Sequence, residues 1–155
     1  GLDRDALCRE MMMNWDEVRT LAADPLATIG AHTCRHLSLS KLDHDTAHQE
    51  IVDSIARVEK ELGRPCHHFS YPYGCSHSAG PREFAMASEL GMRTAVTTRK
   101  GQIDADQHKN RLTELPRVSL NGDFQDERYV KVMLSGMPFR LWNALGRMRR
   151  PADAI

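Results

Sequence analysis

One amphipathic segment between two short apolar runs constrains the fold of this chain most. Residues 47–62 carry apolar side chains at steps of three and four, the spacing of a helix with one buried face. Gly63 is a natural C-terminal cap, and Pro65 lies just beyond it. Residues 27–31 and 66–71, on either side, are predicted strands. A strand, a helix and a second strand in this order predict a parallel pair joined by a right-handed crossover.

The rest of the chain continues this alternation, so we expect one α/β domain over residues 1–155. The further segments are, in order, a helix from Asn14 with a capping box to Glu17, a helix from Pro81 to Gly91, a strand over 93–98, a loop over 99–114, a strand over 115–120, and helices near 124–134 and 138–149.

The composition narrows the class of protein. Lys plus Arg and Asp plus Glu both number 21, so the net charge is zero and argues against broad nucleic-acid binding. No apolar run reaches the roughly 18–20 residues that a transmembrane helix needs. The 4 cysteines stand singly, which favours reduced thiols and a cytoplasmic location. Because the chain begins with Gly1, the lack of a visible signal peptide says little.

Two unusual segments, AHTCRH and FSYPYG, each follow a predicted strand directly. The C-terminal ends of parallel strands meet at one edge of a sheet, so these segments are expected to converge there. His32 and His36 in the first segment are candidate ligands of a divalent metal. Their spacing is a weak signal by itself, since His44 and His48 show it too on the polar side of a helix.

A family resemblance strengthens the metal-site interpretation. IGAHTCRHLSLSKL resembles the H-[ST]-x-x-H-x-x-L motif of the polysaccharide deacetylases, the NodB-like carbohydrate esterases, and FSYPYG resembles their second signature. The resemblance implies a parallel β/α barrel of the polysaccharide deacetylase type, here incomplete and without its N-terminal strands. It also implies hydrolysis of N-acetyl or O-acetyl groups on an acetylated glycan, with a divalent metal as cofactor: zinc, or alternatively cobalt or nickel.

The same resemblance assigns roles to single residues. His32 and His36 would be metal ligands, and the backbone N–H of Tyr73 would bind the oxyanion of the tetrahedral intermediate. Thr33 and Pro72 would lie at the substrate-binding part of the site. A turn-capping hydroxyl is an equal alternative for Thr33, and Pro72 could simply fix the turn.

Several family features have no match in this chain. The first family motif, T-F-D-D-G, supplies the base and one metal ligand, and nothing in residues 1–31 matches it. Ser70 stands where the second signature commonly has Arg, and no His follows His108 to act as the general acid. We therefore expect the natural protein to have N-terminal strands that carry the aspartates, or a partner subunit that covers the open sheet edge. The isolated chain is expected to be inactive, and the alternative function is a non-catalytic module that binds a glycan or a partner.

Four further interpretations stay open. An unrelated α/β domain could hold the histidine pair for structural reasons. Arg117 could orient an active-site carboxylate, although a surface role is the simpler expectation. A second zinc site could form from Cys66, His67, His68, Cys75 and His77, but His67 and His68 alternate across a strand. Residues 138–150 could be an amphipathic membrane-surface helix, but a helix packed on the domain is the simpler expectation.

Overall fold

The computed structural model describes residues 3–119, 122 and 125–148. Its helices are α1 (Arg4–Met11), α2 (Trp15–Ala22), α3 (His44–Leu62), α4 (Pro81–Glu89), α5 (Ala105–His108), α6 (Glu127–Leu134) and α7 (Met137–Met148). The strands are β1 (His68–Ser70), β2 (Thr94–Lys100) and β3 (Leu115–Arg117). Two 3-10 turns, η1 (Leu39–Lys41) and η2 (Leu112–Glu114), lie between them.

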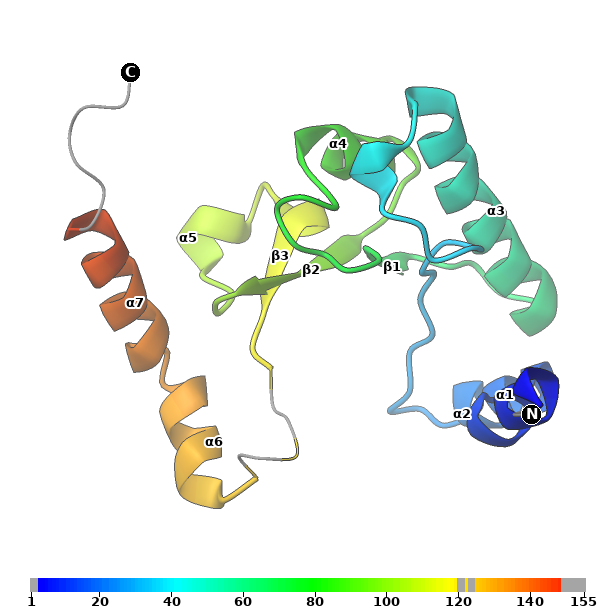
Figure 1. Ribbon diagram of the computed structural model, residues 1–155, viewed down its shortest axis with the longest axis horizontal. Coiled ribbons are helices and arrows are strands. Elements are labelled where there is room, and N and C mark those ends of the chain that lie inside the picture. Colours follow the sequence, from blue (N-terminus) through cyan, green and yellow to red (C-terminus); the bar gives the residue numbers. More distant parts are fainter. Residues whose placement is uncertain (1–2, 120–121, 123–124, 149–155) are drawn as a thin grey trace.

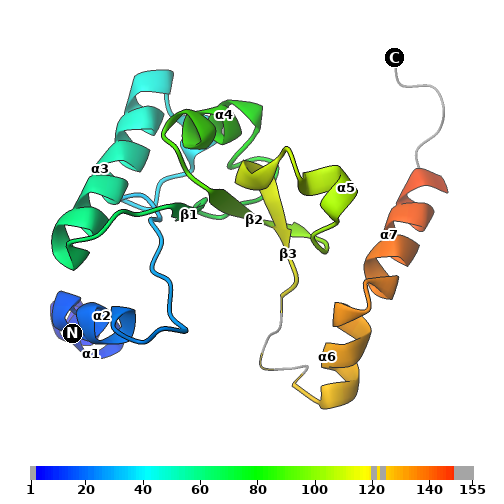
Figure 2. The same cartoon turned by 180° about the vertical axis from the view of Figure 1, so that it is seen from behind.

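The strands form one parallel sheet with β2 in the middle, in the order β1-β2-β3. His68 pairs with Thr94 at the start of β1 and β2, and Val96 pairs with Leu115. Figures 1 and 2 show α3 and α4 on the same side of this sheet. The fold is therefore α/β with a parallel sheet, as the sequence predicts.

Capping explains where the helices begin and end. The side chain of Asp43 accepts a hydrogen bond from the Thr46 N–H at the start of α3, and Gly63 ends the helix with φ of 64°. The predicted capping box of α2 is also present, because Asn14 accepts from the Glu17 N–H and Glu17 accepts from the Asn14 N–H. These local signals were sufficient to predict both helices.

The core lies between the sheet and the two helices that cover it. Phe69 and Tyr71 from the β1 segment pack edge-to-face, and Tyr71 packs in the same way on Phe84 of α4. The buried stripe of α3 includes Ala47, Ile51 and Val58. Burial of this stripe fixes α3 against the sheet, and so fixes the loop that leads into it.

Several predicted elements differ from the structure. Strand β1 is shorter than the predicted 66–71, and β3 ends at Arg117 within the predicted 115–120. Of the predicted strand 27–31, only Ala31 pairs, through an isolated parallel bridge to Phe69. This segment has β1 on one side and no described strand on the other, so the ladder that would order the rest is incomplete. The predicted loop 99–114 instead contains the end of β2, α5 and η2. Helix α1 was not predicted, because its apolar residues have no clear period.

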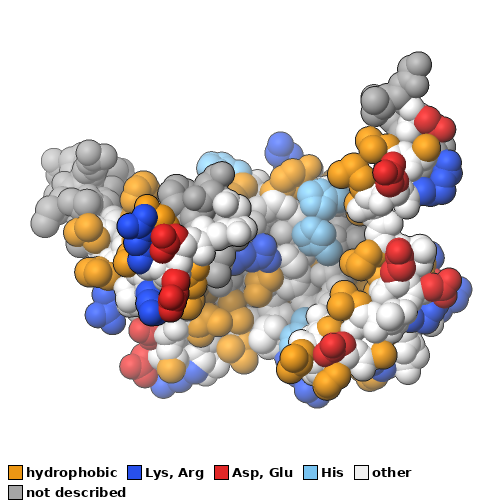
Figure 3. Space-filling model, turned by 90° about the horizontal axis from the view of Figure 1, so that it is seen from below, with side chains coloured by type: hydrophobic (Ala, Val, Ile, Leu, Met, Phe, Trp, Pro, Cys, Tyr) orange, Lys and Arg blue, Asp and Glu red, His pale blue; other side chains and the backbone are white. Residues whose placement is uncertain are grey.

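The face opposite α3 and α4 is hollowed between the N-terminal and the C-terminal helices, and histidine side chains gather in the hollow (Figure 3). Helix α7 confirms a helix in the predicted 138–150 segment, although residues 149–150 lie outside the described residues. Leu141 and Trp142 of this helix are exposed. Within the described ranges, no helix has both the length and the hydropathy of a membrane span.

Candidate active site

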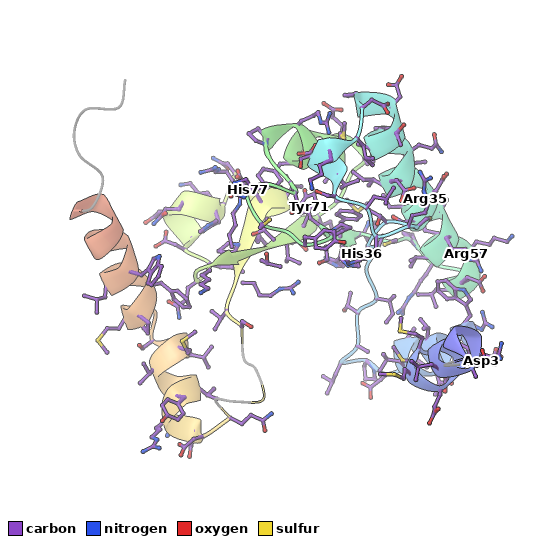
Figure 4. All side chains as sticks on the ribbon, viewed as in Figure 1. Asp3, Arg35, His36, Arg57, Tyr71 and His77 are labelled. Carbon is purple, nitrogen blue, oxygen red and sulfur yellow. The ribbon has the colours of Figure 1, made fainter. Side chains whose placement is uncertain are left out.

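The two predicted metal ligands lie side by side at the C-terminal edge of the sheet. His32 follows the bridge residue Ala31, and its ring centroid is 4.9 Å from that of His36, with an angle of 67° between the ring planes. Two imidazoles on one tetrahedral zinc, at Zn–N distances of about 2.0–2.1 Å, would have centroids roughly 5 Å apart. The observed separation therefore fits two ligands of one ion. Figure 4 shows His36 at this edge, below α3 and α4.

A backbone contact orients the ring of His32. Its Nδ1 lies 2.6 Å from the carbonyl oxygen of Ser70, the last residue of β1. A carbonyl can only accept, so Nδ1 must carry the proton and Nε2 keeps its lone pair. Metal-ligating histidines usually donate their second N–H in this way. The contact thus leaves Nε2 of His32 as the nitrogen that could bind a metal.

The second predicted segment forms a strained turn beside the histidines. Tyr73 has φ of 61°, and the Gly74 N–H donates to the Pro72 carbonyl at 2.7 Å, which together define a γ-turn. Thr98 of β2 fixes this turn, because its hydroxyl donates to the Tyr73 carbonyl at 2.6 Å and its N–H donates to the Gly74 carbonyl at 3.0 Å. The Tyr73 ring lies 4.9 Å from that of His36, centroid to centroid.

The Tyr73 N–H remains available as a donor, because no acceptor for it is found among the described residues. A backbone donor that is held in place and unpaired is what oxyanion binding requires. The Tyr73 side chain is 58% exposed, so the turn faces open space above the sheet edge. The structure therefore brings together His32, His36 and the Tyr73 turn, which the sequence places about 40 residues apart.

Thr33 and Pro72 take structural positions. The Thr33 hydroxyl accepts a hydrogen bond from the His36 N–H at 3.1 Å, which is the turn-capping alternative. Pro72 is among the side chains that are less than 2% exposed. A ring this buried offers little surface to a glycan, which favours the alternative that Pro72 fixes the turn, and its substrate-binding role stays a prediction.

Two charged residues extend the site beyond the predicted set. Glu50 of α3 accepts hydrogen bonds from the backbone of residues 32–36, which we call the histidine loop. Glu50 was not among the site residues predicted from the sequence. The signal was present, because Glu50 lies beside Ile51 on the apolar stripe of α3. Arg117 of β3 donates to the Ser70 hydroxyl at 3.3 Å, so its guanidinium lies at the same sheet edge as His32.

The described residues do not form a complete metal centre. Among them, no group of three or more His, Cys, Asp or Glu side chains is placed to hold an ion. This covers the alternative zinc site, whose member His68 pairs instead with the Thr94 hydroxyl at 2.8 Å. A pair of imidazoles fits two positions of a zinc site, and further ligands would have to come from elsewhere.

Comparison with known families decides the identity of the fold. The family model described as polysaccharide deacetylase matches residues 7–95, more than half of the chain. The chain belongs to the polysaccharide deacetylase family. The matched region contains both histidines of the loop and the Tyr73 turn. Membership in this family excludes the unrelated α/β domain that the sequence had left open.

Two solved structures share the fold of this family member. One is the Streptococcus pyogenes deacetylase PplD in complex with acetate, with a TM-score of 0.69 and 22% identity over 81% of this chain and 54% of that one. Another is IcaB from Ammonifex degensii, with a TM-score of 0.58 and 20% identity over 79% of this chain and 52% of that one. The chain thus spans about half the length of these structures. A search of the curated proteins finds no significant match.

Proposed function

We propose that this chain supplies part of the active site of a metal-dependent hydrolase that removes acetyl groups from a polysaccharide or oligosaccharide. The observation that carries the proposal is the pairing of His32 with His36, 4.9 Å apart between ring centroids, beside the strained Tyr73 turn. Family membership and the similarity to the deacetylase PplD support the reaction class. Zinc is the proposed metal, with cobalt or nickel as alternatives.

Each group has a role that follows from its geometry. His32 and His36 would hold the metal, His32 through Nε2 because its Nδ1 faces the Ser70 carbonyl. The metal, when bound, would act as a Lewis acid that polarises the acetyl carbonyl and the attacking water. The Tyr73 N–H would donate to the oxygen that becomes negative when water adds to the carbonyl carbon. In this proposal the base that removes the water proton is a carboxylate outside the described set.

Zinc titration tests the metal assignment. We expect the chain to bind Zn²⁺, and His32→Ala or His36→Ala to weaken that binding at least tenfold, since each removes a ligand. A matched control is the double variant His44→Ala/His48→Ala. These two histidines are also four residues apart and stack at 6.3 Å, but they belong to α3. Equal loss of zinc in the control would overturn the assignment.

Acetate release tests the reaction. In the protein that carries these 155 residues, release from N-acetylglucosamine oligomers should stop after chelation and return with zinc, and both ligand variants should lack it. Zinc binding without acetate release would favour the alternative of a non-catalytic, glycan-binding module. Release that is unaffected by chelation would overturn the proposed metal dependence.

A further inference from the structure

A buried carboxylate lies behind the histidine loop. Glu50 is only 5% exposed, and it lies on the face of α3 that carries the buried side chains of Ala47, Ile51 and Ser54. An ionised group in such surroundings costs free energy unless it is paired and hydrogen-bonded. Glu50 on this face therefore needs hydrogen bonds that replace those it would make with water.

Among the described residues, all hydrogen-bond partners of this carboxylate belong to the segment between the two histidines. Oε2 of Glu50 accepts from the backbone N–H of Cys34 at 3.2 Å and from that of Arg35 at 3.0 Å. Oε1 accepts from Nε of the Arg35 side chain, which Figure 4 shows beside α3. Burial alone would raise the pKa of Glu50, but the hydrogen bonds from Arg35 and Cys34 lower it below its usual value. The carboxylate is thus held as an anion in a concavity of backbone N–H groups.

The loop that it holds is strained. Thr33 has φ of 62° and His36 has φ of 54°, a region that L side chains rarely adopt. Such a conformation is unfavourable for an L residue and persists only where its surroundings enforce it. Cys34 and Arg35, which bind Glu50, lie between these two residues. The hydrogen bonds to Glu50 are therefore placed to enforce the conformation that brings His36 to His32.

We propose that Glu50 is a positioning residue for the metal site: its carboxylate clamps the backbone at Cys34 and Arg35 and so sets His36 against His32. The inference rests on the proposed function, in that it takes these histidines to be metal ligands. Glu50 touches neither histidine and acts only through the loop.

The test compares Glu50→Gln with Glu83→Gln. Glu83 is a matched control, because it is 2% exposed, pairs with Arg82 at 2.7 Å and accepts from the Gly80 N–H at 2.7 Å. These partners lie at the start of α4 and not in the histidine loop. Zn²⁺ affinity is measured by titration well below the melting temperature. We expect Glu50→Gln to weaken zinc binding about tenfold or more, the usual effect of a lost outer-shell contact, and Glu83→Gln to leave it within about twofold. Both variants should lower the melting temperature.

Hydrogen exchange separates this inference from the proposed function. The Cys34 and Arg35 amides should be protected in the metal-free wild type and in Glu83→Gln, but should exchange faster in Glu50→Gln. If the wild type binds no zinc, the proposed function fails, and exchange alone then decides whether Glu50 holds the loop. Unchanged protection in Glu50→Gln, or equal loss of zinc in Glu83→Gln, would overturn the inference. Should Glu50→Gln fail to fold, Glu50→Asp keeps the charge one methylene short of the loop, and it should weaken zinc binding several-fold.

Discussion

The imidazole of His32 is tied to the last carbonyl of β1: Nδ1 of His32 lies 2.6 Å from the Ser70 oxygen. This contact joins the two sequence segments on which the site depends, since Ser70 lies three residues before Tyr73. The guanidinium of Arg117 donates a hydrogen bond to the hydroxyl of Ser70. Ser70 thus connects the histidine loop with β3 across the edge of the sheet.

The contact predicts one tautomer for His32. Because the Ser70 carbonyl can only accept, neutral His32 should carry its proton on Nδ1 in the metal-free protein. Nitrogen chemical shifts of ¹⁵N-labelled protein, recorded where the imidazole is neutral, would report this directly. His48, which makes no comparable carbonyl contact among the described residues, should show the mixture typical of free imidazole. A proton on Nε2 of His32 would contradict the assigned orientation.

Two glycines give a matched test of the Tyr73 turn. Gly63 and Gly74 have φ of 64° and 60°, so Ala strains the backbone similarly at both, by about 1–2 kcal/mol. A Cβ at Gly63 would meet nothing within 4 Å, whereas one at Gly74 would lie 2.5 Å from the backbone N of Thr98. Gly74→Ala should therefore cost about 2 kcal/mol more than Gly63→Ala, the scale of an overpacked contact. Urea denaturation of the two variants measures the difference, and equal losses would show that the turn yields freely.

The hydroxyl of Thr98 is predicted to hold the Tyr73 peptide. Thr98→Val keeps the backbone hydrogen bond to Gly74 but removes the 2.6 Å bond to the Tyr73 carbonyl. The loss should be about 0.5–1.5 kcal/mol of folding free energy, the net value of one hydrogen bond. Acetate release in the complete protein should fall by more than this loss of stability explains, because the Tyr73 N–H is no longer fixed. Thr97→Val, which instead removes the bond to the Leu115 carbonyl and the acceptor of the Arg99 N–H, is the control.

Local signals predicted most of the fold, and long-range contacts account for what they missed. Capping residues and apolar spacing were sufficient for α2, α3 and α4, since these effects act within a few residues. The convergence of His32 with Tyr73 followed from parallel topology. The role of Thr98 could not be predicted from the sequence, because threonine is common in strands and its hydrogen bond to the Tyr73 carbonyl depends on the fold. Glu50 did have a sequence signal, because it is a carboxylate on the apolar stripe of α3.

The strand expected over 27–31 shows the limit of local reasoning most clearly. Its composition suits a buried strand, yet only Ala31 is paired, through Phe69. Strand structure depends on pairing with neighbouring strands, and a sequence pattern does not reveal which neighbours are present. Gly30 adds a local constraint, because a Cβ there would lie 2.7 Å from the His68 carbonyl oxygen. That close approach of the backbones explains the glycine one residue before the bridge.

The buried carboxylate of Glu50 makes stability depend on pH. Burial raises its pKa, but the stronger combined effect of the Arg35 and Cys34 hydrogen bonds lowers it below the usual 4.5. A folded-state pKa below the unfolded-state value means that the unfolded chain binds the proton more tightly, so stability falls as the pH drops. The contribution of Glu50 should be complete above about pH 5 and should be lost progressively as the pH falls through the folded-state pKa.

Denaturation of the wild type and Glu50→Gln, each at about pH 6.5 and pH 3.5, measures this contribution. The wild type should lose more stability between the two pH values, with a difference on the order of 1 kcal/mol, because Gln has no proton to gain. The pKa of Asp43, which caps α3, is also lowered, mainly by the Thr46 backbone hydrogen bond, but Asp43 is present in both proteins and cancels. Equal acid losses in the two proteins would mean that the clamp on the histidine loop does not depend on the ionised carboxylate.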